Sequence, residues 1–225
     1  MGYLRVPVRR VESVSISRDA VLDWIKAYAA AITTSKDYLT KLDADIGDGD
    51  HGTNMDRGFQ SVLAKLPSVA DKDIGTIFKT VGMTLVSTVG GAGGPLYGTL
   101  FIQMGTAVAG KMELTLADWA AAVQAGVNGV VMRGKANLGD KTMVDALTPA
   151  AASLKNAAAN GVAFNEALQE AEHAAAEGMI ATIPLVARKG RASYLGERSA
   201  GHQDPGATSS HMLLKTAADT WARAG

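Results

Sequence analysis

Apolar residues recur with the 3.6-residue period of an amphipathic helix along most of this chain of 225 residues. The first such segment follows Ser17, a candidate N-cap, and four of its apolar residues share one face: Val21, Trp24, Ile25 and Tyr28. Further periodic segments run approximately over 54–66, 73–88, 95–110, 115–132, 142–158, 162–182 and 207–223. Strand-length runs that alternate β-branched and polar residues are scarce. The sequence therefore predicts an all-α bundle of about eight helices.

Several of these segments carry start signals. Asp73 and Thr115 are candidate N-caps because their side-chain oxygens can accept from free amides of the first turn. Pro95 suits a first helical turn, where a backbone N–H has no intrahelical acceptor in any case. No internal repeat is strong enough to indicate a solenoid.

Composition limits the class of protein. Lysine plus arginine equals aspartate plus glutamate, at 22 each, so net charge gives no reason to expect nucleic acid or an anionic membrane as partner. At 47% apolar residues the chain is expected to fold. It has no apolar run of about 18 residues, so we expect no membrane span. Zero cysteines exclude disulfides, zinc-thiolate sites and thiol nucleophiles. We expect a soluble, cytoplasmic protein.

The organisation expected from the sequence is simple. A chain of this length can bury one core, and no change in composition divides it. The first residues are partly basic but lack the apolar segment of a secretory signal. We therefore expect residues 1–16 to form an N-terminal extension and residues 17–225 to form one domain.

The segment 43–54 has the composition of a metal or phosphate site, with four carboxylates, three glycines and a histidine in twelve residues. Gly47 and Gly49 interrupt a helix, so three carboxylates can converge from an irregular loop: Asp43, Asp48 and Asp50. Oxygen ligands favour a hard cation, and Mg²⁺ commonly takes one or two carboxylates together with substrate phosphates. The segment predicts a magnesium site.

Other interpretations of this segment stay open. Asp/Gly clusters are often solvated turns. A calcium-binding EF-hand is excluded, because the twelfth residue counted from Asp48 is Phe59 instead of glutamate. His51 is either a hydrogen-bonded structural residue or a contact to phosphate or to a ligand ring.

Two further connections are rich in glycine or polar residues. In segment 89–95 four glycines allow backbone amides to approach an anion in front of a helix start, although a flexible hinge would look the same. Segment 187–207 is long for a helix connection and offers Arg191 to phosphate and Asp204 to a ribose hydroxyl or an adenine amine. Segment 139–142 imitates the end of a P-loop, but Asp140 separates the glycine from the lysine and no strand precedes it, so a P-loop is excluded.

Taken together, these motifs resemble a known family. The chain is similar over about residues 18–222 to the nucleotide-binding L subunits of bacterial dihydroxyacetone kinases that work with a phosphotransferase system. The resemblance rests on segments 42–43, 46–55, 90–98, 133–135, 139–143, 187–199 and 201–209. It implies an eight-helix antiparallel barrel with nucleotide and two Mg²⁺ ions at one end.

The resemblance also implies residue roles. Three aspartates would hold the paired magnesium ions and serve catalysis: Asp43, Asp48 and Asp50. Two loops would line the phosphates of ADP or ATP, through His51, Gly52, Thr53, Asn54, Ala92 and Gly93. The nucleoside and diphosphate would be enclosed by Gly134, Met143, Arg191, Asp204, Pro205 and Gly206.

The activity implied is phosphoryl transfer from magnesium-bound nucleotide to dihydroxyacetone held by a separate K subunit. A phosphohistidine-bearing M subunit would rephosphorylate the retained ADP, and a transcriptional regulator is a further partner. Three alternatives stay open. They are a kinase subunit that uses free ATP on a related triose or sugar, an all-α magnesium-dependent hydrolase, and a non-catalytic ADP-sensing module.

Overall fold

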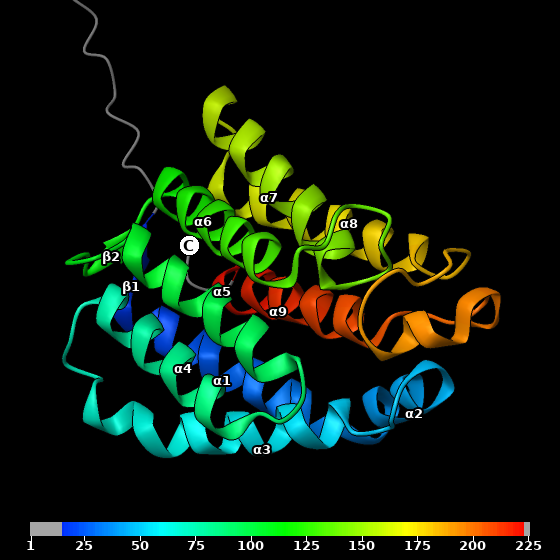
Figure 1. Ribbon diagram of the computed structural model, residues 1–225. Helices are drawn as coiled ribbons and strands as arrows, with labels where there is room; N and C mark the ends of the chain where they lie inside the picture. The colour runs from blue at the N-terminus through cyan, green and yellow to red at the C-terminus, as the bar shows by residue number, and fades with distance from the viewer. Residues whose placement is uncertain (1–14, 223–225) are drawn as a thin grey trace, which may run out of the picture.

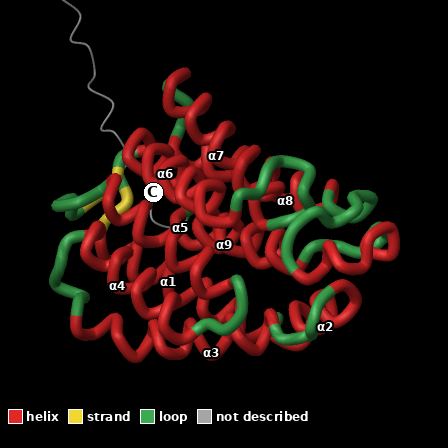
Figure 2. Tube along the Cα trace, in the orientation of Figure 1, coloured by secondary structure: helices red, strands yellow, loops and turns green. Residues whose placement is uncertain are grey.

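The computed structural model describes residues 15–222 of the chain. It has α-helices at α1 (Arg18–Thr34), α2 (Lys36–Ile46), α3 (His51–Lys65), α4 (Ile74–Thr88), α5 (Gly93–Ala107), α6 (Leu116–Gly134), α7 (Met143–Asn160), α8 (Phe164–Ala181) and α9 (Pro205–Trp221). Two 3₁₀ helices, η1 (Leu66–Ser68) and η2 (Arg191–Ser199), lie in connections. Two short strands, β1 (Ile16–Ser17) and β2 (Glu113–Leu114), pair antiparallel. The all-α prediction is confirmed, and helix dominates the trace in Figure 2.

The predicted helix starts are confirmed by their hydrogen bonds. Ser17 accepts from the amide of the third residue of α1, and Asp73 accepts from the amide of Thr76. Thr115 forms a reciprocal capping box with Asp118. Most of the expected extension, residues 1–14, lies outside the described residues, while Ile16 pairs with Leu114 and is buried.

One element differs from the sequence expectation. The helical stretch after Ser17 breaks at Ser35, whose φ of −96° and ψ of 8° depart from helical geometry. Because of this break, residues 15–222 contain nine α-helices where the periodic segments predicted about eight. The break turns α2 away from α1, and α2 then contacts η2 and α9 (Figure 1). This new direction brings the acidic segment toward the connection between α8 and α9.

The helices close into a barrel. Helix α1 packs against α3, and from α3 to α9 each helix packs against the next one along the chain. Helix α9 then packs against α1, which closes the ring. Trp24 lies at the centre of an aromatic cluster, with its ring centroid 5.2 Å from that of Trp119 and 5.3 Å from that of Trp221. Its indole N–H donates to the carbonyl oxygen of Leu213, so the buried polar atom is satisfied. The core thereby ties the first helix to the last (Figure 1).

None of the helices in the part of the chain that the structure describes is long and apolar enough to cross a membrane.

Helices α4 and α5 approach closely through facing glycines. A Cβ atom built on Gly82 would lie 2.6 Å from the carbonyl oxygen of Gly98 and 2.7 Å from a side-chain carbon of Ile102. Gly75 and Gly105 oppose each other in the same way farther along the same two helices. The α4–α5 turn, which faces the site described below, is therefore held by backbone-to-backbone packing.

We predict that Gly82→Ala destabilises the protein. In an open helix this change stabilises by about 1 kcal/mol, but here overpacking should outweigh that gain and lower the free energy of unfolding by roughly 1–3 kcal/mol. Urea denaturation followed by circular dichroism measures it. Met83→Ala, on the exposed neighbouring position, is the control and should change stability by less than about 0.5 kcal/mol. Unchanged stability in Gly82→Ala would contradict the close packing.

Candidate functional site

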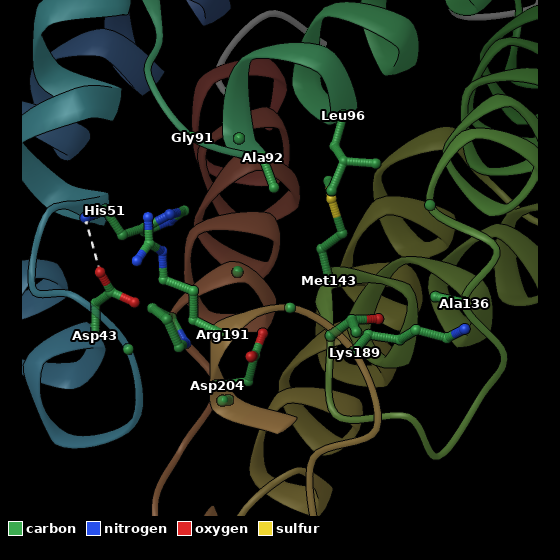
Figure 3. Close-up of a pocket in the computed structure, with 18 of the residues that line it drawn as sticks. Asp43, His51, Gly91, Ala92, Leu96, Ala136, Met143, Lys189, Arg191 and Asp204 are labelled. Atoms are coloured by element: carbon green, nitrogen blue, oxygen red, sulfur yellow. Dashed lines mark hydrogen bonds between the residues drawn. The ribbon is translucent and has the colours of Figure 1, made fainter. Parts of the chain in front are cut away.

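A cavity of about 920 Å³ opens at one end of the barrel. It is bounded by the α2–α3 loop, the 89–92 turn at the start of α5, the end of α6, the start of α7, and the segment leading into α9 (Figure 3). Its volume falls in the range of small-molecule sites. Segments that are far apart in the sequence therefore contribute to one concave surface.

Three carboxylates converge at one side of this cavity. One oxygen from each of Asp43, Asp48 and Asp50 lies within 4.8 Å of the others. Asp43 belongs to the last turn of α2, Asp48 to the loop, and Asp50 is the N-cap of α3. Oxygen-only ligands at this spacing suit a hard divalent cation such as Mg²⁺. The donor set therefore fits the metal that the sequence predicts.

Local backbone geometry explains this convergence. A Cβ on Gly47 would lie 2.3 Å from a carboxylate oxygen of Asp43, and Gly49 has a φ of +70°, which favours glycine. The Asp43 carboxylate accepts from the backbone amides of Asp50 at 2.8 Å and His51 at 3.1 Å. Asp43 thus fixes the start of α3 as well as facing the cavity.

Arg191 reaches this cluster from η2. Its Nε lies 3.1 Å from a carboxylate oxygen of Asp48, and its side chain is 68% exposed. Figure 3 shows the Arg191 side chain extending toward the side of the cavity where His51 and Asp43 lie. A planar cation at this position can bind a carboxylate or an oxygen of a phosphate group. The long connection before α9 therefore delivers positive charge to the acidic side of the cavity.

His51 is anchored by a buried hydroxyl network. Its Nε2 lies 2.9 Å from the Ser209 hydroxyl oxygen, which is 2.7 Å from the Tyr97 hydroxyl. Burial lowers the pKa of His51 below its usual 6.5, and nearby Asp43 and Asp50 oppose this shift. With Nε2 engaged by Ser209, the ring orientation is set from α9. Both proposals for His51 made from sequence, structural hydrogen bonding and facing a ligand, are compatible with this position.

The glycine-rich turn presents backbone amides. Gly91 has a φ of +61°, and α5 starts immediately afterwards with Ala92 as its N-cap and no side-chain cap hydrogen bond. The first-turn amides of α5 therefore remain free to meet an anion, favoured by the positive end of the helix dipole. A Cβ on Gly90 would come within 3.0 Å of the Asn54 amide, so this turn packs directly on α3.

The opposite side of the cavity is apolar. Leu96 and Met143 face one another there, away from Asp43, in Figure 3. Met143 is 4% exposed, and Ala136 adds a second buried apolar side chain. The cavity is thus acidic and amide-lined at one side and apolar at the other. Such a gradient suits a ligand that has a charged end and a flat apolar end.

Asp204 lies between these two sides as the N-cap of α9. Its side chain is buried and accepts from the amide of Ala207 at 2.7 Å. Burial raises its pKa from 3.8 to about 7; the Ala207 hydrogen bond and the charge of Lys141 oppose the rise, and Asp145 and Asp43 add to it. This carboxyl group therefore changes charge near neutral pH.

The predicted site residues fall into two groups. Those that line the cavity are Asp43, Asp48, Asp50, His51, Asn54, Ala92, Gly93, Gly134, Met143, Arg191, Asp204, Pro205 and Gly206. Gly52 and Thr53 do not line it. Gly52 packs against α2, where a Cβ would lie 2.0 Å from the carbonyl oxygen of Lys36, and Thr53 is exposed to solvent. These two side-chain positions therefore lie outside the cavity lining.

Sequence reasoning missed two participants. Ser209, on α9, was part of a recognised motif but had no assigned role, although it holds His51. Lys141 belongs to a segment that was excluded as a P-loop and counted in the family resemblance without a role for the lysine, yet it is 1% exposed and borders the cavity. In both cases the sequence signal was a polar residue at a position that the helical pattern does not place on an exposed face.

The sequence matches the DAK2 domain family over residues 45–219. Among solved structures, the native dihydroxyacetone kinase of C. freundii superimposes with a TM-score of 0.71 at 26% identity, covering 97% of this chain and 38% of that one. The same kinase in complex with AMP-PNP and Mg²⁺ gives a TM-score of 0.69 at 27% identity, covering 97% and 37%. The chain spans less than half of that kinase. It belongs to the DAK2 domain family.

Relatives of similar length show which members of this family the chain resembles. The chain is 48% identical over 202 residues to the ADP-binding subunit of the PEP-dependent dihydroxyacetone kinase of Escherichia coli, covering 90% of this chain and 96% of that one. It is 40% identical to the ADP-binding subunit of the PTS-dependent kinase of Lactococcus lactis, covering 88% and 95%. Within the family, the chain therefore groups with the ADP-binding subunits of dihydroxyacetone kinases.

We predict a pH-dependent effect of Asp204→Asn, which keeps the acceptor for Ala207 but cannot ionise. Between about pH 4 and pH 7 the folded protein holds a proton at Asp204 that the unfolded chain has lost, so this group lowers the free energy of unfolding as pH rises. The variant should be more stable than wild type by roughly 1–4 kcal/mol above pH 7, with the difference vanishing toward pH 4.

Urea denaturation at a series of pH values, with a metal chelator present, measures this difference. Asp37→Asn, at an exposed position on α2, is the matched control and should leave the pH profile unchanged. A stability difference for Asp204→Asn that stays constant from pH 4 to pH 8 would exclude the raised pKa.

Proposed function

We propose that this chain is the nucleotide-binding subunit of a dihydroxyacetone kinase of the phosphotransferase-system-dependent type, and that its cavity holds magnesium and ADP or ATP. The observation that carries the proposal is the convergence of Asp43, Asp48 and Asp50 within 4.8 Å at the polar side of the cavity. Similarity at 48% identity to the Escherichia coli ADP-binding subunit, over nearly its full length, supports the same assignment.

In this proposal the residues divide the work along the polarity gradient of the cavity. Asp43, Asp48 and Asp50 hold two magnesium ions, which when bound neutralise the negative charge of the diphosphate. The first-turn amides of α5 and the Arg191 guanidinium hold the phosphate oxygens. Met143 and Leu96 cover the base, and Asp204 accepts a hydrogen bond from the nucleoside.

Phosphoryl transfer needs positioning and charge neutralisation more than a protein nucleophile. The γ-phosphorus bond to the ADP oxygen breaks as a bond forms to a hydroxyl oxygen of dihydroxyacetone, and the proton of that hydroxyl passes to solvent water. We propose that a separate K subunit presents this acceptor and that a phosphohistidine-bearing M subunit rephosphorylates ADP retained in the cavity. A transcriptional regulator is a further proposed partner. The protein is proposed to act in the cytoplasm, and its functional domain is proposed to comprise residues 17–225.

A second candidate is a subunit that exchanges free ATP. The complex of the C. freundii kinase with AMP-PNP, an ATP analogue, and Mg²⁺ favours it, because that kinase is 27% identical to this chain. Native mass spectrometry of freshly purified protein separates the two: retained ADP supports a cofactor, whereas an exchangeable site supports ATP as substrate. Hydrolysis of nucleotide without any partner would instead support the hydrolase alternative.

We predict that Asp48→Asn loses magnesium-dependent ADP binding. Removing one anionic ligand should weaken binding at least about 100-fold, because even residues that only support metal ligands contribute 10–100-fold. Isothermal titration with ADP in the presence and absence of Mg²⁺ measures the effect. Transfer to dihydroxyacetone in the reconstituted three-subunit system should be lost in parallel.

Asp37→Asn provides the matched control, since Asp37 is an exposed carboxylate on α2 that lies outside the cluster. It should bind ADP as the wild type does. The melting temperature of metal-free Asp48→Asn should equal or exceed that of wild type, because three neighbouring like charges become two. Unchanged affinity in a folded Asp48→Asn protein would overturn the assignment.

A further inference from the structure

The connection from residue 182 to residue 204 joins α8 to α9 and carries both Arg191 and Asp204. Its two ends lie side by side. The amide of Gly201 donates to the carbonyl oxygen of Ile183 at 2.8 Å, and the amide of Asp204 donates to the Thr182 hydroxyl oxygen at 3.1 Å. The connection is therefore a closed loop whose ends meet beside the cavity.

Lys141 bonds to both ends of this loop. Its ammonium donates to the carbonyl oxygens of Thr182 at 2.6 Å and Ile183 at 3.4 Å, at the first end, and to that of His202 at the second. An ammonium has three N–H donors, so these three carbonyls satisfy it. Between residues 15 and 222, no carboxylate oxygen lies within 4.0 Å of its nitrogen.

A rigid turn presents this lysine. Lys141 has a left-handed φ of 62°, and the preceding Gly139 has a φ of 89°. The Asp145 carboxylate accepts from the amides of Gly139 at 2.5 Å and Thr142 at 2.7 Å, which fixes the turn from both sides. The amide of Arg188 donates to the carbonyl oxygen of Asp140 at 3.1 Å, so the turn and the loop are also joined directly.

Burying an ammonium group in a protein interior is energetically unfavourable. Desolvating a cation carries a penalty of several kcal/mol, and an apolar side chain of similar volume is often neutral or stabilising in its place. Burial lowers the pKa of Lys141 from its usual 10.5, while Asp204 and Asp145 oppose the shift. Fold stability alone therefore does not explain a lysine here, whereas three directed hydrogen bonds that hold a loop in one position do.

We propose that Lys141 is a positioning residue for nucleotide binding: its ammonium clasps both ends of the 182–204 loop and holds Arg191 and Asp204 over the cavity. Lys141 touches neither the carboxylate cluster nor the first turn of α5. It acts through the loop, so its loss raises the rate at which bound nucleotide escapes more than it lowers the rate of capture. The inference rests on the proposed function for its nucleotide step, but the closure of the loop is measurable without nucleotide.

The test compares wild type with Lys141→Met, which keeps the length of the side chain and removes the charge. Two of the three carbonyls keep a backbone donor in this variant, since Thr182 also accepts from Leu185 and Ile183 from Gly201, so the variant is expected to fold. Hydrogen exchange of amides in 184–203 should become at least about 10-fold faster without nucleotide. Dissociation of a fluorescent ADP analogue with Mg²⁺ should become about 10-fold faster, with little change in association rate.

Three further variants keep the proposal falsifiable. Lys155→Met, at an exposed lysine of α7, is the matched control and should leave both readouts at wild-type values. Thr182→Val removes the acceptor for the Asp204 amide and should accelerate both processes if the loop ends are what matter. Lys141→Arg, which keeps a cation, should restore slow ADP dissociation at least in part.

The outcomes separate this inference from the proposed function. Faster loop exchange together with faster ADP dissociation in Lys141→Met supports the clasp. If exchange is faster but dissociation is unchanged, or if neither changes, the clasp is overturned. A wild-type protein that binds no ADP would refute the proposed function alone, and loop exchange would then decide whether Lys141 closes the loop.

Discussion

The geometry of the site depends on the hydrogen bonds that the Asp43 carboxylate accepts. Its carboxylate accepts from the amides of Asp50 and His51, so the end of α2 and the start of α3 are joined by one side chain. That bond brings two other carboxylates close to it, an arrangement that like charges oppose. The amides at the start of α3 and the guanidinium of Arg191 offset part of this repulsion. The resulting excess of negative charge is the physical basis of the proposed magnesium site.

The barrel keeps this cluster in place from a distance. Aromatic packing around Trp24 and the glycine contacts between α4 and α5 fix the helices on which the loops stand. The buried hydroxyls of Tyr97 and Ser209 then transmit the position of α9 to His51. Core packing and site geometry are thus linked through a few polar contacts at one end of the barrel.

Much of this was predictable from sequence because it has local causes. Helix periods and caps at Ser17, Asp73 and Thr115 depend on neighbouring residues, and so does the convergence of aspartates across Gly47 and Gly49. The break at Ser35 was missed because no glycine or proline marks it, and tertiary contacts of α2 decide it. Lys141 and Ser209 were missed because their partners lie tens of residues away in the chain.

The contact between Arg191 and Asp48 has a consequence for the order of events. In the proposed magnesium site, a divalent cation bound to Asp48 would compete with the guanidinium for the negative charge of this carboxylate. The exposed arginine side chain would then be available to an incoming anion. On this proposal, metal entry and phosphate capture would be successive halves of one exchange of partners, with the cation bound first.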